Sequence, residues 1–128
     1  MSYTVLIVDD SAITRAMIKR TLVMAQVPLA QCLEAGDGKT GLEMLAARKV
    51  DLVLADLHMP NMTGVEMTRH ILSNEATRHI PVIVVSAEPS AERLDALRQQ
   101  GVRGCIRKPF TPEAIREMVN QVLGAAHA

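Results

Sequence analysis

The sequence predicts an α/β fold in which five parallel strands and five helices form a doubly wound sandwich. Two observations support this class. Short apolar runs rich in β-branched residues, typical of buried strands, recur along the chain. Segments with helical patterns lie between them. Strict alternation of strands and helices implies a parallel sheet with right-handed crossovers and helices on both faces.

The expected strands are the short apolar runs. The first contains Val5-Leu6-Ile7-Val8 and the third contains Val53-Leu54-Ala55, and acidic residues end both. We assign the strands to Thr4–Val8, Leu29–Glu34, Leu52–Asp56, Pro81–Val85 and Val102–Arg107.

The expected helices lie near residues 12–25, 38–48, 63–74, 90–100 and 112–124. The last is the best marked, because its apolar residues form one stripe at helical spacing. Thr111 is expected as its N-cap, with Pro112 at the first helical position. Thr63 and Glu66 have the spacing of a capping box. We expect residues 1–124 to form one domain and residues 125–128 a short tail.

The composition narrows the class of protein. A chain of 128 residues has room for one domain, and a content of 48% hydrophobic but 2% aromatic residues requires an aliphatic, Met-rich core. The 14 basic residues balance 14 acidic ones, which argues against nucleic-acid binding. No membrane span or signal peptide is recognisable. The two cysteines fit reduced thiols, so the expected compartment is the cytoplasm.

Acidic residues gather at two strand ends. Asp9 and Asp10 follow the first strand, and Asp56 ends the third. In doubly wound sheets, sites form outside the carboxyl ends of the strands, so the three carboxylates should meet. Their repulsion calls for a hard divalent cation such as Mg²⁺. Asp56 is the candidate nucleophile, since a carboxylate can attack phosphorus to give an acyl phosphate.

Two further strand ends complete the pattern. Ser86 follows the fourth strand and could hydrogen-bond a phosphoryl oxygen, and Lys108 follows the fifth and could supply a positive charge to phosphate. Each residue alone has a simpler explanation. The acids could be helix caps, Ser86 a turn residue and Lys108 a surface residue. Chance agreement at four strand ends is improbable, so together they indicate a phosphoryl-transfer site.

These residues resemble the receiver domain of two-component response regulators over essentially the whole chain. The length is similar to that of single-domain, chemotaxis-type (CheY-like) regulators. The resemblance, rather than the pattern of residues, implies a flavodoxin-like sheet of order 2-1-3-4-5. It is carried by Val8-Asp9-Asp10-Ser11, Glu34-Ala35-Gly36-Asp37-Gly38, Asp56-Leu57-His58-Met59-Pro60-Asn61-Met62-Thr63-Gly64, Val85-Ser86-Ala87 and Lys108-Pro109-Phe110.

The resemblance also implies a ligand set for Mg²⁺. Asp10, Asp56 and the backbone carbonyl of His58 would bind the cation, and Asp9 would act through water. From the residues alone, adjacent side chains in extended structure point opposite ways. One of the two adjacent aspartates is therefore expected to bind directly and the other through water.

The implied function is a signalling switch rather than an enzyme acting on other substrates. Asp56 would accept a phosphoryl group from a phosphohistidine on a sensor histidine kinase or phosphotransfer protein. Lys108 and Ser86 would contact the phosphoryl oxygens. The signal would reach a downstream target, in chemotaxis for example, through the fourth helix, fifth strand and fifth helix. Neither nucleic acid nor membrane is an expected partner.

Three modulatory positions stand out. Many receivers carry an aromatic ring three residues before the lysine, but here the residue is Cys105, so a ring-flip switch is absent. Cys105 is expected to pack as a small apolar residue. The strand order that the resemblance implies places it at the opposite edge of the sheet from Cys32, too far for a disulfide. We hypothesise that His58 and Glu88 set the lifetime of the acyl phosphate by controlling water access. A solvent-exposed histidine without a role is the alternative.

Other classes of protein fit less well. A haloacid-dehalogenase-type phosphatase generally has Asp-x-Asp, whereas this chain has His58 at the second position. A phosphate-independent receiver usually lacks the acidic pair, the acceptor or the lysine. A flavin or nucleotide binder needs a phosphate loop after the first strand. Within the receiver class, a phosphorelay or phosphate-sink role remains open, as does a receiver domain excised from a larger regulator.

Overall fold

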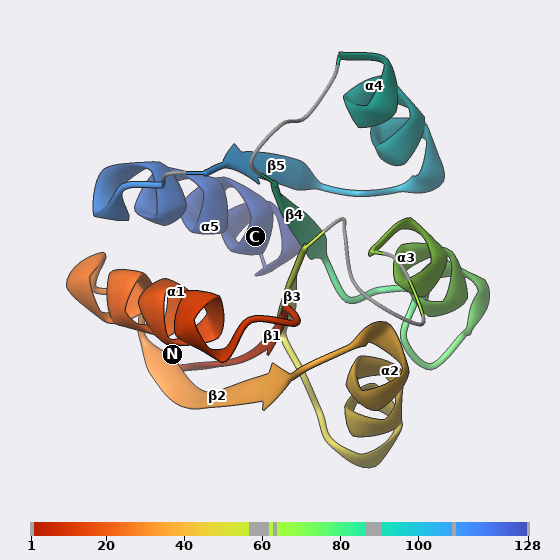
Figure 1. Ribbon diagram of the computed structural model, residues 1–128, viewed down its shortest axis with the longest axis horizontal. Coiled ribbons are helices and arrows are strands. Elements are labelled where there is room, and N and C mark those ends of the chain that lie inside the picture. Colours follow the sequence, from red (N-terminus) through yellow and green to blue (C-terminus); the bar gives the residue numbers. More distant parts are fainter. Residues whose placement is uncertain (1, 57–61, 63, 87–90, 109, 128) are drawn as a thin grey trace.

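The computed structural model describes every residue except 1, 57–61, 63, 87–90, 109 and 128. Strands and helices alternate along the whole chain (Figure 1), as the hydrophobic pattern predicts. The strands are β1 (Tyr3–Val8), β2 (Leu29–Ala35), β3 (Leu52–Asp56), β4 (Val82–Ser86) and β5 (Gly104–Arg107). The helices are α1 (Ala12–Met24), α2 (Gly38–Ala47), α3 (Gly64–Ser73), α4 (Ala91–Gln100) and α5 (Pro112–His127).

The strands form one parallel sheet in the order β2-β1-β3-β4-β5, which confirms the expected topology. β1 and β3 are neighbours although a strand and two helices separate them in sequence. Val8 pairs with Ala55, and Asp56 in turn pairs with Val85 of β4. This register brings the carboxyl ends of β1, β3 and β4 to one edge of the sheet.

Helices α1 and α5 cover one face of the sheet, and α2, α3 and α4 cover the other (Figure 1). Alternate strand residues therefore enter different cores. Val5, Ile7 and Leu54 pack with residues of α1 and α5, whereas Leu6, Val8 and Val53 pack with residues of α2 and α3. Because strands buried on both faces cannot slip by one residue without exchanging the two cores, this packing fixes the register that positions the strand ends.

Several element bounds differ from the sequence prediction for local reasons. Val102 was expected to begin the fifth strand, but its N–H donates to the Leu97 carbonyl of α4 at 3.0 Å, so it lies in the turn that follows that helix. β5 begins two residues later. α5 was expected to end at Gly124 but continues to His127, in keeping with the high helix propensity of Ala125 and Ala126.

Side-chain caps define the starts of three helices. The Ser11 hydroxyl accepts the Thr14 N–H at 3.2 Å and begins α1. The Thr111 hydroxyl accepts the Ala114 N–H at 3.1 Å, which confirms the predicted cap of α5. Asp37 caps α2, and its bonds from Thr40 lower the pKa of its carboxyl. The capping box predicted at Thr63 lies outside the described residues.

The outer face of α1 is unusually apolar. Ile13, Met17, Val23 and Met24 are the large hydrophobic residues exposed on the described part of the molecule, with Ile13 76% accessible. Within the same described part, no helix is long and apolar enough to cross a membrane.

Candidate functional site

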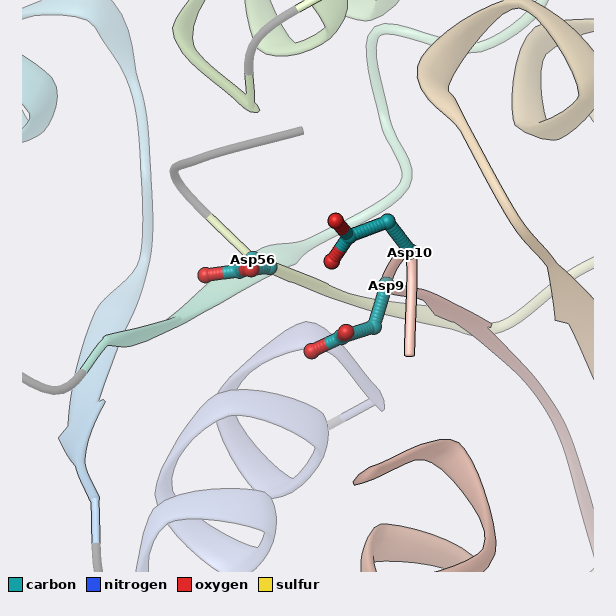
Figure 2. A group of neighbouring side chains, drawn as sticks. All are labelled: Asp9, Asp10 and Asp56. Carbon is teal, nitrogen blue, oxygen red and sulfur yellow. The ribbon is translucent and has the colours of Figure 1, made fainter. Parts of the chain in front are cut away.

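Three carboxylates converge where β1 and β3 end side by side (Figure 2). Each of Asp9, Asp10 and Asp56 offers a carboxylate oxygen, and these oxygens all lie within 4.8 Å of one another. Asp9 is buried at 2% accessibility, Asp56 is half-buried and Asp10 is exposed. The structure therefore brings together the acidic residues that the sequence placed at two strand ends.

Both carboxylate oxygens of Asp9 and its backbone N–H have partners. Its Oδ1 accepts the Ser11 N–H at 2.8 Å, and its Oδ2 lies 3.3 Å from the Lys108 ammonium. Its own N–H donates to the Ala35 carbonyl of β2 at 3.1 Å. Ser11, and neither aspartate, caps α1, so the helix-cap explanation for Asp9 and Asp10 is wrong.

Lys108 lies inside the acidic cluster. Its Nζ is 3.3 Å from Asp9 Oδ2 and 4.0 Å from Asp56 Oδ1, and its side chain is 24% exposed. The backbone N–H of Lys108 donates to the Ser86 carbonyl at 2.8 Å, which anchors the end of β5 to the end of β4. The surface-lysine explanation is therefore wrong, because the ammonium is committed to carboxylates that would otherwise repel one another.

Ser86 is the last residue of β4 and is 1% exposed. It lies one position beyond Val85, the register partner of Asp56, and pairs with Arg107 on its other side. The sheet thus carries Asp56 and Ser86 at the ends of adjacent strands, as the sequence predicted. His58, Glu88 and Pro109 lie outside the described residues.

Cys105 packs against the side of the sheet that α4 covers. It pairs with Val84 and contacts the small apolar cluster of Val84, Leu97 and Val102. Burial raises the pKa of its thiol, and the positive charge of Arg98 opposes this only in part. A raised pKa favours the unreactive protonated form, in agreement with the expected packing role. Cys32 lies in the strand at the opposite edge of the sheet, and both thiols are free.

Arg15 was not among the residues expected at this site. It lies on the first turns of α1, where it donates from Nη1 to the Asp9 carbonyl and from Nε to Glu34 Oε1 at 3.1 Å. Its side chain is 17% exposed. No motif marks this contact, because Glu34 comes within reach only through the pairing of β1 with β2.

The donor set fits a hard divalent cation. Three carboxylates provide the oxygen ligands that Mg²⁺ prefers, and an ammonium beside them can contact a phosphoryl group. An acidic group, a lysine and a serine at the carboxyl ends of one doubly wound parallel sheet define a candidate site for phosphoryl chemistry.

Comparison with known proteins agrees with this class. The family model of the response regulator receiver domain matches residues 5–120. The chemotaxis protein CheY of Pseudomonas aeruginosa is 35% identical over 118 residues, which cover 92% of this chain and 94% of that protein. CheY-3 of Vibrio cholerae is also 35% identical, over 92% of this chain and 89% of its own length.

A solved structure shows the same fold. The chemotaxis protein CheY4 of Vibrio cholerae superposes with a TM-score of 0.86 at 29% identity, covering 96% of this chain and 100% of that one. The chain therefore belongs to the response regulator receiver domain family.

Replacing Asp10 by asparagine should stabilise the metal-free protein. Removal of one of three clustered negative charges relieves repulsion, so the free energy of unfolding in EDTA should rise by about 1 kcal/mol. Urea unfolding followed by circular dichroism measures this change. Glu75→Gln, at an exposed position outside the cluster, is the matched control. A less stable Asp10→Asn protein would show that the carboxylate is structurally required.

Alkylation should reveal the raised pKa of Cys105. At neutral pH the folded protein holds less thiolate at this position than the unfolded chain, so iodoacetamide should modify Cys105 several-fold more slowly in the folded state. The rate should climb at higher pH than it does in urea. Peptide mass spectrometry distinguishes Cys105 from Cys32. Equal rates in the folded and unfolded states would contradict the packing that raises the pKa.

Proposed function

We propose that this chain acts as the receiver of a two-component response regulator, in which Asp56 accepts a phosphoryl group in a Mg²⁺-dependent reaction. The observation that carries the proposal is the convergence of Asp9, Asp10 and Asp56 around the Lys108 ammonium. The phosphoryl donor would be a sensor histidine kinase or a phosphotransfer protein. The similarity to CheY proteins supports a role in chemotaxis, and the proposed compartment is the cytoplasm.

The cation would be held by Asp10, Asp56 and the backbone carbonyl of His58. When bound, it would neutralise charge and align the phosphoryl group for attack. Asp9 would act through water. Its contacts support this assignment, because Oδ1 already accepts the Ser11 N–H and Oδ2 is paired with Lys108. Asp10 is the exposed member of the pair and is accessible to an entering ion.

In the transfer step, an Asp56 carboxylate oxygen attacks phosphorus. The new O–P bond forms as the N–P bond of the donor phosphohistidine breaks, and the electron pair of that bond returns to the imidazole nitrogen. The Lys108 ammonium lies close enough to Asp56 to contact one oxygen of the transferred phosphoryl group. The Ser86 hydroxyl would donate a hydrogen bond to another of these oxygens. Phosphoryl transfer depends mainly on such positioning and charge neutralisation.

The structural change caused by phosphorylation would be transmitted through the strand ends that hold the site. A phosphoryl group at Asp56 adds negative charge and acceptor oxygens, which would draw Ser86 and Lys108 inward. The Lys108 N–H bond to the Ser86 carbonyl links the two strand ends. Displacement there would reach a downstream target on the surface formed by α4, β5 and α5. Cys105 lies on this path, where many receivers carry a ring, so the coupling would use aliphatic packing instead.

Phosphorylation of Asp56 is the direct test. Wild-type protein incubated with Mg²⁺ and acetyl phosphate should gain one phosphoryl group by intact-mass spectrometry. Asp56→Asn should gain none, and neither should wild type in EDTA. Asp95→Asn, the same change at an exposed position in α4, should behave as wild type. A gain by Asp56→Asn equal to that of wild type would exclude Asp56 as the acceptor.

If the folded wild type gains nothing, beryllofluoride and Mg²⁺ provide the second measurement. Fluorine NMR would detect the bound analogue of an acyl phosphate. Binding to wild type but not to Asp56→Asn would mean that the site is competent but requires its own kinase. Absence of binding would reject the proposed acceptor function.

The lifetime of the acyl phosphate should depend on His58. If its side chain controls water access, His58→Ala should change the rate at which the phosphorylated protein loses mass after removal of acetyl phosphate. His70→Ala, at an exposed position of α3, is the control and should hydrolyse as wild type does. Equal rates for wild type and His58→Ala would eliminate the hypothesis.

A further inference from the structure

We propose that Arg15 is a positioning residue that clamps the segment carrying Asp9 and Asp10. Its guanidinium bridges two elements, with Nη1 donating to the Asp9 carbonyl and Nε donating to Glu34 of β2. The inference rests on the proposed function, because it assigns Arg15 a role in presenting Asp10 to the cation.

The bond from Arg15 to the Asp9 carbonyl lies directly before Asp10 in the backbone. The Asp9 carbonyl belongs to the peptide that joins Asp9 to Asp10, so a donor fixed on that oxygen fixes the plane of this peptide. The direction of the Asp10 side chain depends on that plane. The Asp9 N–H donates to the Ala35 carbonyl at 3.1 Å, so this bond and the clamp hold the same short segment from its two sides. Asp10 follows the anchored peptide and is exposed, so its direction depends on the clamp.

Both the backbone and the side chain of Arg15 are held in place. Its backbone N–H donates to the Ser11 carbonyl at 3.0 Å in the first turn of α1, and its side chain is paired with Glu34. A guanidinium can donate in two directions from a rigid plane, which the single ammonium of lysine does not reproduce. The ion pair is half-exposed on the Glu34 side, so its direct contribution to stability is small. The main effect of the ion pair is therefore to orient the guanidinium rather than to stabilise the fold.

Charge and geometry predict opposite results for the same substitution. Near an acidic cluster, a positive charge opposes cation binding, so its removal alone would tighten the binding of Mg²⁺. Loss of a clamp would weaken binding, and removal of groups that orient metal ligands typically costs about 10–100-fold in affinity. Arg15→Met removes both the charge and the hydrogen bonds, so the direction of the change separates the two effects.

The test is an amide NMR titration with Mg²⁺ that follows the residues of the β1–α1 segment. We expect about tenfold weaker binding for Arg15→Met and weaker binding also for Arg15→Lys, which keeps the charge. Arg20→Met, an exposed position on the same helix, should bind as wild type does. Equal or tighter binding by Arg15→Met would overturn the proposal, as would full affinity in Arg15→Lys.

Glu34 tests whether the clamp acts as a unit. Glu34→Gln removes the charge but keeps an oxygen acceptor, so its effect should be smaller than that of Arg15→Met. In the Arg15→Met background it should add nothing, because its partner is already gone. Glu34→Gln also serves if Arg15→Met fails to fold by circular dichroism. Additive effects of the two substitutions would show that they act independently and would overturn the clamp.

Amide hydrogen exchange in EDTA tests the clamp without any cation. The Asp9 and Ser11 amides, bonded to Ala35 and to Asp9 Oδ1, should exchange faster in Arg15→Met than in wild type or Arg20→Met. Unchanged exchange would overturn the inference. A different outcome is faster exchange in Arg15→Met together with no binding of Mg²⁺ by the wild type. That result would reject the proposed function but would keep Arg15 as a residue that holds the structure of this segment.

Discussion

The repulsion among three carboxylates at one edge of the sheet is the constraint on which the rest of the site depends. Parallel pairing of β1 with β3 brings a carboxylate oxygen from each of Asp9, Asp10 and Asp56 within 4.8 Å of the other two. Like charges at this separation raise the free energy of the folded state unless another charge offsets them. Lys108 provides that offset from the position after β5, a strand that lies two places away from β3 in the sheet. The fold thus assembles a charge cluster that its lysine partly neutralises and that a cation could complete.

The same arrangement explains why Asp9 and Asp10 differ despite being adjacent. The buried member has its oxygens satisfied by Ser11 and Lys108, as a buried carboxylate must be. The exposed member retains access to solvent. One residue therefore serves the internal hydrogen-bond network and the other faces solvent, a division that follows from burial rather than from chemical type.

The positions of the site residues were largely predictable, because they follow from two properties that sequence carries well. Apolar runs mark buried strands, and the residue after each run lies at a strand end whatever the order of strands. Asp56, Ser86 and Lys108 could all be placed in this way. The residues alone could not decide which of Asp9 and Asp10 would be buried, since burial depends on which strand end lies beside them, and only the resemblance assigned them different roles. Arg15 could not be found, because its bond to Glu34 exists only when β2 pairs with β1. The start of β5 was misjudged at Val102, where an apolar residue donates its N–H to a carbonyl of α4 instead of starting a strand.

The two cores that flank the sheet have a consequence for how such a domain can diverge. Register is fixed by residues buried between sheet and helices, and the chemistry sits on strand ends, so neither depends on the outer surfaces of the helices. The exposed apolar residues Ile13 and Met17 of α1 contribute to neither core. Substitutions on those surfaces are therefore nearly free of structural cost. One arrangement of strand-end residues can therefore be kept unchanged while the outer surfaces of the helices diverge independently of it.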